Sequence, residues 1–485
     1  MGEGQGIREK YRSASGHVRA EAAWQKIVKS GPPERLAEAA LNLGLLLERR
    51  NAQKKARAAY QRAIDAGQPE YSPMAAFNLG GLLNRQGEYG GARAAYQRAA
   101  DSAHPQVAAA AARSLALLLE KQGDIDGARA AYDQAIVSGH PEESTAAGVN
   151  LALMLREHGD AVGAVQAMRR VVSSGHAEYA AAVGVDLGIL LAEQDDMAGA
   201  RAAWQQVIDS GHIQHAPTAA INLGIQLGRD GDPNGARAAY LAASNSGHPD
   251  KGPAAANNLG KLLHDGGDTA GARAAWQQAI ESGHRQWAPN AAVSLGALLK
   301  DEGDFAGARA LYRLAIDSGH TDAVPNAEYN LGVMLYQQGD LQAAKAAYRR
   351  AIASSHPKYA PAAARNLGNT LSEQGDLAGA EAAWKIAIHS GAPESAPAAA
   401  VNLGNQLRAH GDLVGARAAY QVALDSGNQD VASKAAVNLG NLLRQQGDAD
   451  GARAAYQIAI QCGDPEVAAV AGRARATLPS SDGEA

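Results

Sequence analysis

Residues 437–440 read Val437-Asn438-Leu439-Gly440, and the same four letters stand 36 residues earlier as Val401-Asn402-Leu403-Gly404. A second phrase, Gly-Ala-Arg-Ala-Ala-Tyr, begins at Gly91 and again at Gly451. Leucine recurs at the 36-residue spacing at Leu43, Leu79, Leu115, Leu151, Leu187, Leu223, Leu259, Leu295, Leu331, Leu367, Leu403 and Leu439. A period of this length, sustained along the chain, indicates stacked copies of one supersecondary unit rather than a single globular core.

Each repeat contains the start and stop signals of two helices. We number repeat positions from 1 to 36, so that a residue number is a multiple of 36 plus its position. Position 1 is proline in seven repeats, for example Pro73, and proline suits the first turn of a helix because its missing N–H is not needed there. The pair Gly123-Asp124 and its equivalents end this first helix, since glycine supplies the left-handed residue and aspartate caps the second helix. The second helix ends at Ser-Gly-His, as in Ser282-Gly283-His284, so each repeat predicts a helical hairpin.

Helical periodicity predicts which faces form the core. Positions 3, 4, 7, 8 and 11 share one face of the first helix and are mostly Ala, Ala, Leu, Gly and Leu. Glycine or alanine at position 8 lets the second helix approach closely. In the second helix, alanine at position 20 is followed four residues later by Tyr or Trp in most repeats. We interpret these aromatic residues as core: Tyr60, Tyr96, Trp204, Trp276, Tyr312, Trp384 and Tyr456.

This pattern resembles the tetratricopeptide repeat. The residues that match its signature in one repeat are Leu79, Gly80, Leu83, Gly87, Ala92, Tyr96 and Ala99. The unit is two residues longer than in that family, and its return loop is similar to that of the Sel1-like repeat. The resemblance implies an all-α fold, a right-handed α-solenoid of stacked helix-turn-helix repeats. We expect residues 1–36 to form a degenerate capping repeat, 37–468 to form twelve repeats, and 469–485 to hold the end of a capping helix and a disordered tail.

Composition narrows the class of protein. Hydrophobic residues make up 46% of the 485 residues, and 45 basic against 50 acidic residues give a net charge of −5, which offers no global basic field for nucleic acid. The single cysteine, Cys462, leaves no intrachain disulfide and favours a reducing compartment. No apolar run reaches 18 residues and the N-terminus has no apolar signal core. We therefore expect a cytoplasmic protein, and the excess of arginine over lysine suggests a GC-rich bacterial genome.

The face of the first helix opposite the core holds positions 2, 5, 6, 9, 12 and 13. Position 6 is asparagine in nine repeats: Asn42, Asn78, Asn150, Asn222, Asn258, Asn330, Asn366, Asn402 and Asn438. Asparagine is a mediocre helix former, and its amide suits the backbone of an extended peptide. The resemblance implies that this position lines a concave groove and contacts bound peptide. The alternative is that each asparagine bonds an adjacent repeat or water and was copied by duplication.

The remainder of this face changes character along the chain. Its N-terminal half is apolar, which implies a partner, a capping segment or self-association: Leu41, Leu45, Phe77, Leu117, Val149, Leu153, Val185, Ile189, Ile221 and Ile225. Its C-terminal half is polar and basic: Lys261, Arg365, Asn369, Asn405, Arg408, Lys434, Asn441 and Arg444. The set Asn402, Asn405, Arg408, Asn438, Asn441 and Arg444 resembles the carboxylate clamp of chaperone-binding tetratricopeptide domains. It implies an acidic segment or C-terminal carboxylate as ligand; the alternative is a merely solvated polar groove.

Other recurring polar residues do not predict chemistry. Eight histidines share one loop position: His104, His140, His176, His212, His248, His284, His320 and His356. Adjacent hairpins stack about 10 Å apart, whereas metal ligands lie about 2 Å from the ion, so we predict a turn-stabilising role and no metal. The arginines at position 21, such as Arg57, are explained by salt bridges. No phosphate loop, His-Glu-x-x-His or cysteine pair is present, and we expect no enzyme and no cofactor.

Four repeat positions diverge together between residues 165 and 195. Val165, Met168, Asp186 and Asp195 replace Arg, an aromatic residue, Asn and Gly. This divergence indicates drift, a bend or a divergent functional site.

Three functions are compatible with the sequence. The first is a non-enzymatic scaffold or adaptor that holds an extended protein or peptide segment along the groove. The second is self-assembly into dimers or fibres through near-identical repeats and an apolar groove. The third is RNA binding, which some related helical repeats perform, but the acidic balance and the lack of aromatic residues facing the groove argue against it.

Overall fold

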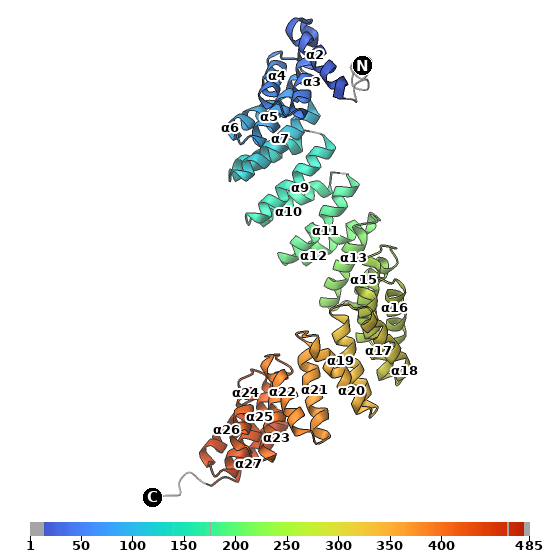
Figure 1. Cartoon of the computed structure of the whole chain (residues 1–485), viewed down its shortest axis with the longest axis vertical. Coiled ribbons are helices and arrows are strands. Elements are labelled where there is room, and N and C mark those ends of the chain that lie inside the picture. The colour runs from blue at the N-terminus through green and yellow to red at the C-terminus, as the bar shows by residue number, and fades with distance from the viewer. Residues whose placement is uncertain (1–13, 139, 175, 463–464, 480–485) are drawn as a thin grey trace. The chain divides into compact units, whose positions relative to one another are not determined.

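The structure is a computed structural model that describes residues 14–138, 140–174, 176–462 and 465–479. Within these ranges the chain is entirely helical and contains no strand (Figure 1). It divides into two compact units, Met1–Gln226 (unit 1) and Leu227–Ala485 (unit 2), and the boundary falls inside helix α13 (Ala216–Arg229). Each unit is a solenoid of stacked helical hairpins, which confirms the predicted fold class.

The described part of unit 1 begins with a single helix and continues with five hairpins. Its elements are α2 (Ala14–Ser30), the 3-10 turn η1 (Pro33–Arg35), α3 (Leu36–Arg49), α4 (Gln53–Asp65), α5 (Ser72–Arg85), α6 (Tyr89–Ala100), α7 (Pro105–Lys121), α8 (Ile125–Val137), α9 (Pro141–Glu157), α10 (Ala161–Val172), α11 (Ala177–Glu193) and α12 (Met197–Asp209).

Among its described residues, unit 2 contains six hairpins between a first and a last single helix. Its elements are α14 (Pro233–Ser244), α15 (Lys251–Asp265), α16 (Thr269–Glu281), α17 (Trp287–Asp301), α18 (Phe305–Asp317), α19 (Ala323–Gln337), α20 (Leu341–Ala353), α21 (Tyr359–Glu373), α22 (Leu377–His389), α23 (Ala396–Ala409), α24 (Leu413–Leu424), α25 (Gln429–Gln445), α26 (Ala449–Gln461) and α27 (Pro465–Ala476).

The most extensive contacts join the two helices of one hairpin, such as α21 with α22. The second helix then packs against the first helix of the next repeat, and first helices of neighbouring repeats also touch, as α7 does with α9. Within each unit, the internal hairpins are therefore covered on both sides by their neighbours, which is how a repeat too small to form its own core buries its apolar faces.

The predicted turn between the two helices is confirmed. Gly123 has a φ of +78°, a left-handed value that glycine adopts without steric cost. The Asp124 carboxylate then accepts a hydrogen bond from the Gly127 N–H at 3.0 Å and caps the second helix. Asp195 replaces the glycine of the divergent repeat, yet it keeps the same conformation with a φ of +64°. The divergent repeat therefore retains its turn.

The aromatic residues of the second helices are core, as predicted. Tyr60, Tyr132 and Tyr420 are fully buried. The glycine at position 8 of the first helix lies directly against the ring: a Cβ added to Gly404 would be 2.5 Å from Cε1 of Tyr420. In the preceding hairpin of α9 and α10, Met168 takes the buried aromatic position, and its flexible thioether fills the space.

Six of the eight loop histidines cap the helix that follows them, whereas Nδ1 of His176 and of His212 has no hydrogen-bond partner among the described residues. His284 Nδ1 accepts hydrogen bonds from the backbone N–H groups of Gln286 and Trp287, both at 3.2 Å. Its Nε2 lies 3.2 Å from Asp250 Oδ1 in the preceding loop, so the ring carries its proton on Nε2, an assignment that follows from the bonding pattern. His104, His140, His248, His320 and His356 make equivalent caps. The predicted turn-stabilising role is confirmed for these six residues.

Replacing His248, His284, His320 and His356 together by alanine is expected to lower the thermal midpoint of the full chain by about 5 °C or more, since each lost cap costs about 1 kcal/mol. Replacement by asparagine is the matched control, because Asn428 stands at the same repeat position and its Oδ1 accepts a bond from the Val431 N–H at 3.2 Å. The asparagine variant should melt within about 2 °C of the wild type. Circular dichroism at 222 nm measures both, and an equal fall in both variants would contradict the capping role.

The arginines at position 21 join neighbouring repeats. Arg57 pairs with Glu88 at 2.8 Å and Arg129 pairs with Asp160 at 3.2 Å, in each case across to the turn of the next repeat. These pairs are exposed and each stabilises the stack by less than about 1 kcal/mol. The salt bridges that the sequence predicts on the second helix are therefore contacts between repeats.

The two ends of the chain differ from the internal repeats. Ala20 and Trp24 of α2 are buried, whereas Ile7 and Tyr11, which continue the repeat pattern in sequence, lie outside the described residues. In α27 the buried residue is Ala471, and Arg473 and Arg475 are exposed. The tail expected to be disordered lies outside the described residues from position 480 onward.

Candidate functional site

We call the solvent-facing side of the first helices, at positions 5, 6, 9, 12 and 13, the first-helix face. All nine asparagines at position 6 are half-buried, four of them in unit 1 and five in unit 2. Their bonding is not uniform. Asn42 Nδ2 donates to the carbonyl oxygen of Glu38, one turn back on its own helix, at 3.0 Å, and Asn330 does the same to Asn326 at 3.0 Å.

The last asparagines form a network that links buried aromatic side chains to the surface. Trp384 Nε1 donates to Asn369 Oδ1 at 3.0 Å, and Asn402 Nδ2 of the next repeat donates to the same oxygen at 2.8 Å. One repeat later, Tyr420 OH and Asn438 Nδ2 donate to Asn405 Oδ1 at 2.7 and 3.0 Å. Asn402 and Asn438 therefore bond an adjacent repeat, which was the structural alternative for this row of residues.

The same network fixes which end of each position 9 amide faces outward. Tyr456 OH donates to Asn441 Oδ1 at 2.8 Å, so the oxygens of Asn369, Asn405 and Asn441 all accept bonds from aromatic residues of their own hairpins. Each NH2 group then points away from the ring. Among the described residues, no acceptor takes a hydrogen bond from these three NH2 groups. The surface of α21, α23 and α25 is therefore rich in unused donors.

Sequence reasoning missed this link between the aromatic residues and position 9. The signal was present: Trp384, Tyr420 and Tyr456 each follow an asparagine by 15 residues. Where position 9 is Lys261 or Ala297 this pairing is missing, and the indole N–H of Trp276 and the hydroxyl of Tyr312 have no partner in the described part of the chain.

Three arginines accompany the amides in unit 2. Arg365 Nε lies 3.4 Å from Asn366 Oδ1, and Arg444 Nη1 lies 3.4 Å from Thr477 Oγ1. No carboxylate among the described residues pairs with Arg365, Arg408 or Arg444. Burial raises the pKa of Tyr420, and the positive charge of Arg408 opposes this shift. The face combines uncompensated positive charge with amide donors.

The hydroxyl groups of the buried tyrosines in unit 1 have different hydrogen-bond partners. Tyr60 OH donates to Glu48 at 2.6 Å and Tyr132 OH donates to Glu120 at 2.7 Å. Burial, followed by the hydrogen bond to Glu48, raises the pKa of Tyr60 above its ordinary value. These carboxylates stand at position 12, so position 9 is left free in these repeats.

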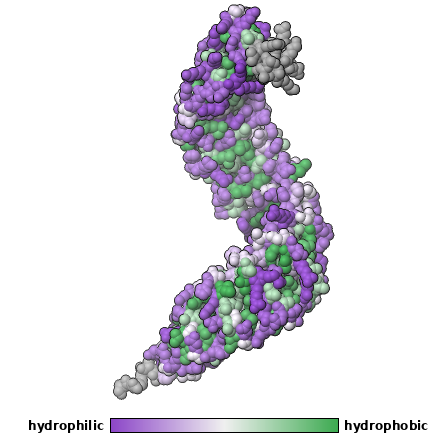
Figure 2. Space-filling view, in the orientation of Figure 1, coloured by the Kyte–Doolittle hydropathy of each residue, from purple (hydrophilic) through white to green (hydrophobic). Residues whose placement is uncertain are grey.

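The ten apolar residues predicted on this face separate into three groups. Leu117, Leu153, Ile189 and Ile225 are 43%, 45%, 37% and 36% exposed and all stand at position 9. The half-buried members are Leu45, Phe77, Val149 and Ile221. Leu41 and Val185 are buried by the chain itself, more fully than Phe77, Val149 and Ile221 at the same position 5, and they are core rather than surface. In Figure 2, hydrophobic residues reach the surface of unit 1 in the region of α9 to α11.

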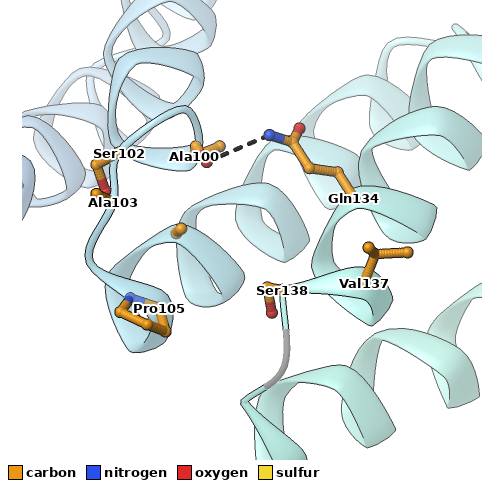
Figure 3. A pocket seen from close by; sticks show the side chains of 8 residues that line it. Ala100, Ser102, Ala103, Pro105, Gln134, Val137 and Ser138 are labelled. Carbon is orange, nitrogen blue, oxygen red and sulfur yellow. Dashed lines mark hydrogen bonds between the residues drawn. The ribbon is translucent and has the colours of Figure 1, made fainter.

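A pocket of about 350 Å³ lies at the ends of α6 and α8. Gln134 reaches across it and donates to the carbonyl oxygen of Ala100 at 3.2 Å, beside Val137 and Ser138 (Figure 3). The described residues that line it include no titratable side chain. The described residues also contain no group of three or more His, Cys, Asp or Glu residues able to hold a metal ion. No described helix has the length and apolarity that crossing a membrane requires.

Stacked helical hairpins with an aromatic core and a polar outer face define an α-solenoid repeat protein. The sequence profile described as tetratricopeptide repeat matches residues 13–71, 68–108, 113–182, 221–291, 293–360, 365–431 and 427–467. The chain belongs to the tetratricopeptide repeat family.

Solved structures provide further comparisons. The chain is similar to c5321, described as a protective antigen present in uropathogenic Escherichia coli strains displaying an SLR fold. The two sequences are 19% identical, the match covers 96% of this chain and 99% of that chain, and the TM-score is 0.46. Yeast Tom70 has 13% identity, coverage of 92% and 96%, and a TM-score of 0.41. Pseudomonas aeruginosa pilF has 20% identity, coverage of 46% and 99%, and a TM-score of 0.37. No curated protein sequence matches this chain.

Proposed function

We propose that this chain is a non-enzymatic scaffold that binds an acidic segment or C-terminal carboxylate of a partner protein on the first-helix face of unit 2. Tetratricopeptide repeat proteins generally act as non-catalytic scaffolds that mediate protein–protein interaction. The free thiol of Cys462 suits a reducing compartment, and we place the protein in the cytoplasm.

One observation carries the proposal: the amide oxygens of Asn369, Asn405 and Asn441 are occupied from inside the hairpins, so their NH2 groups face outward beside Arg408 and Arg444. A row of donors with positive charge is complementary to carboxylate and carbonyl oxygens. The rigid, planar guanidinium can bind a carboxylate through two parallel hydrogen bonds. The asparagines at position 6 then serve mainly to hold this arrangement, since Asn402 and Asn438 bond the amides of the preceding repeat.

We expect Arg408→Gln/Arg444→Gln to weaken binding of an acidic peptide at least tenfold, because two charge-assisted contacts are lost. The probe is a fluorescein-labelled ten-residue peptide that ends in two glutamates and a free carboxylate, and fluorescence anisotropy at low salt measures its binding to the full chain. Both arginines were chosen because neither belongs to the amide network.

The control is Arg349→Gln/Arg417→Gln, which removes the same charge from exposed sites on α20 and α24. Its affinity should stay within about twofold of the wild type. Equal weakening in both variants would mean that bulk charge alone attracts the peptide, and absence of binding by the wild type would refute the proposal.

A further inference from the structure

We infer that the first-helix face of unit 1 is a second site, which binds an aliphatic segment of a partner protein that carries one Lys or Arg side chain, with Asp186 as the acceptor for that cation. This inference rests on the proposed function, since it gives the same scaffold a second site, which prefers a cationic ligand where the unit 2 site prefers an anionic one. Unit 2 offers donors and positive charge, whereas unit 1 offers aliphatic surface around a carboxylate.

The aliphatic surface is a regular row that we call the unit 1 stripe, made of Leu117, Leu153, Ile189 and Ile225. These residues stand at position 9 of four successive repeats, on α7, α9, α11 and α13, and each is more than a third exposed. First helices that carry them are in contact, α7 with α9 and α9 with α11. An exposed row of large aliphatic side chains is typical of an interaction surface.

Packing does not require aliphatic residues at position 9. In unit 2 the same position is asparagine at Asn405 and Asn441, and the hairpins close equally well around it. In the hairpin of α11 and α12, Trp204 Nε1 donates instead to the carbonyl oxygen of Val185 at 3.1 Å. The residue at position 9 therefore need not accept a hydrogen bond from the buried ring, and the Ile189 side chain is available to a partner.

Asp186 stands on α11 one turn before Ile189, at position 6, where nine other repeats have asparagine. Its side chain is exposed, and no described residue donates it a hydrogen bond or lies within ion-pair distance. Partial burial among its neighbours raises the pKa of Asp186, and the charges of Arg156 and His215 oppose that shift without contacting it directly. A carboxylate beside aliphatic surface gains more from an incoming cation than one in open water, because the local dielectric constant is lower.

The spacing of the stripe defines the ligand. Packed helices lie about 10 Å apart, and a chain extended in the polyproline II conformation advances about 3.1 Å per residue with three residues per turn, so every third side chain points to the same side. An extended segment therefore presents an aliphatic side chain to successive repeats at about every third residue, and about ten residues cover the stripe. Because Asp186 lies on the helix that carries Ile189, the cationic residue belongs next to the third aliphatic residue of the segment.

The probe is a fluorescein-labelled twelve-residue peptide with leucine at every third position, lysine next to the third leucine and serine elsewhere. A matched peptide carries norleucine in place of the lysine. We expect the full chain to bind the lysine peptide at least fivefold more tightly by fluorescence anisotropy. Asp186→Asn, which installs the residue of the other repeats, should reduce binding of the lysine peptide to the level of the norleucine peptide.

Leu153→Asn/Ile189→Asn, which installs the position 9 residue of unit 2, should weaken both peptides at least tenfold. Circular dichroism confirms that both variants keep the helical signal of the wild type. The inference is overturned if lysine gives no advantage, if the advantage survives Asp186→Asn, or if sedimentation velocity shows a dimer of the wild type that the stripe variant converts to monomer. In the last case the occupant of the stripe is a second copy of the chain.

The two sites can fail separately. A chain that binds the acidic peptide but neither leucine peptide keeps the proposed function and overturns this inference. A chain that binds the lysine peptide equally well with and without Arg408→Gln/Arg444→Gln, but never binds the acidic peptide, refutes the unit 2 site and supports the unit 1 site.

Discussion

Gly332→Val is expected to destabilise the hairpin of α19 and α20 by about 3 kcal/mol. A Cβ at Gly332 would lie 2.6 Å from both Cδ1 and Cε1 of Tyr348. The ring is buried and cannot move aside, so valine would have to push the two helices apart. The gain in helix propensity over glycine is below about 1 kcal/mol and does not offset the clash.

Hydrogen exchange read by mass spectrometry measures this effect locally, which suits a repeat array that need not unfold in one step. Peptides from α19 and α20 should exchange about a hundredfold faster than in the wild type, since about 1.4 kcal/mol corresponds to tenfold. Gly90→Val is the control, because a Cβ on this helical glycine of α6 meets nothing within 4 Å. Gly332→Ala should be milder, as Ala116 occupies position 8 of another repeat. Unchanged exchange in α19 and α20 would contradict the close approach.

The contact that this substitution tests could be predicted from the sequence. Small residues at position 8 and aromatic residues at position 24 recur with the repeat, and helical periodicity alone turns them toward each other. The turns at glycine and the helix starts at proline were predicted for the same reason. Each of these features depends on backbone conformation and on residues close in sequence.

The site could be predicted only in part, because its decisive contacts depend on side-chain rotamers and on neighbouring repeats. Periodicity placed Asn405 on the outer face but could not show that its oxygen accepts a bond from Tyr420, 15 residues away. It also placed Val185 on that face, whereas adjacent helices bury it. Periodicity describes one helix at a time, and the exposure of position 5 is set by the next repeat. The binding roles of the predicted residues remain predictions.

Arg350→Gln is the second substitution with a large expected effect, because it removes the only described partner of a buried carboxylate. Glu328 is 3% exposed and stands at position 4, where Ala292 and Ala364 occupy the neighbouring repeats. Its Oε1 accepts a hydrogen bond from Arg350 Nε at 2.6 Å, and this bond raises the pKa of Arg350. Oε2 is buried and has no partner among the described residues.

Removing one member of a buried ion pair costs about 3–5 kcal/mol. Because the Arg350 side chain is 54% exposed, water can partly replace it, and we expect a loss of about 2 kcal/mol. Hydrogen exchange of α19 and α20 should therefore accelerate about thirtyfold. Glutamine is the chosen replacement because Gln134 and Gln278 stand at the same repeat position and donate to backbone carbonyls.

The matched control removes the carboxylate as well. Glu328→Ala/Arg350→Gln installs the residues of other repeats at both positions, and we expect stability equal to or greater than that of the wild type, because no buried charge remains to be compensated. The two substitutions should therefore be non-additive by at least about 1 kcal/mol in a double-mutant cycle. Additive effects, or an Arg350→Gln variant with wild-type exchange, would show that Glu328 does not depend on Arg350. A non-additive cycle would show that this repeat retains an ion pair where its neighbours achieve the same packing with alanine.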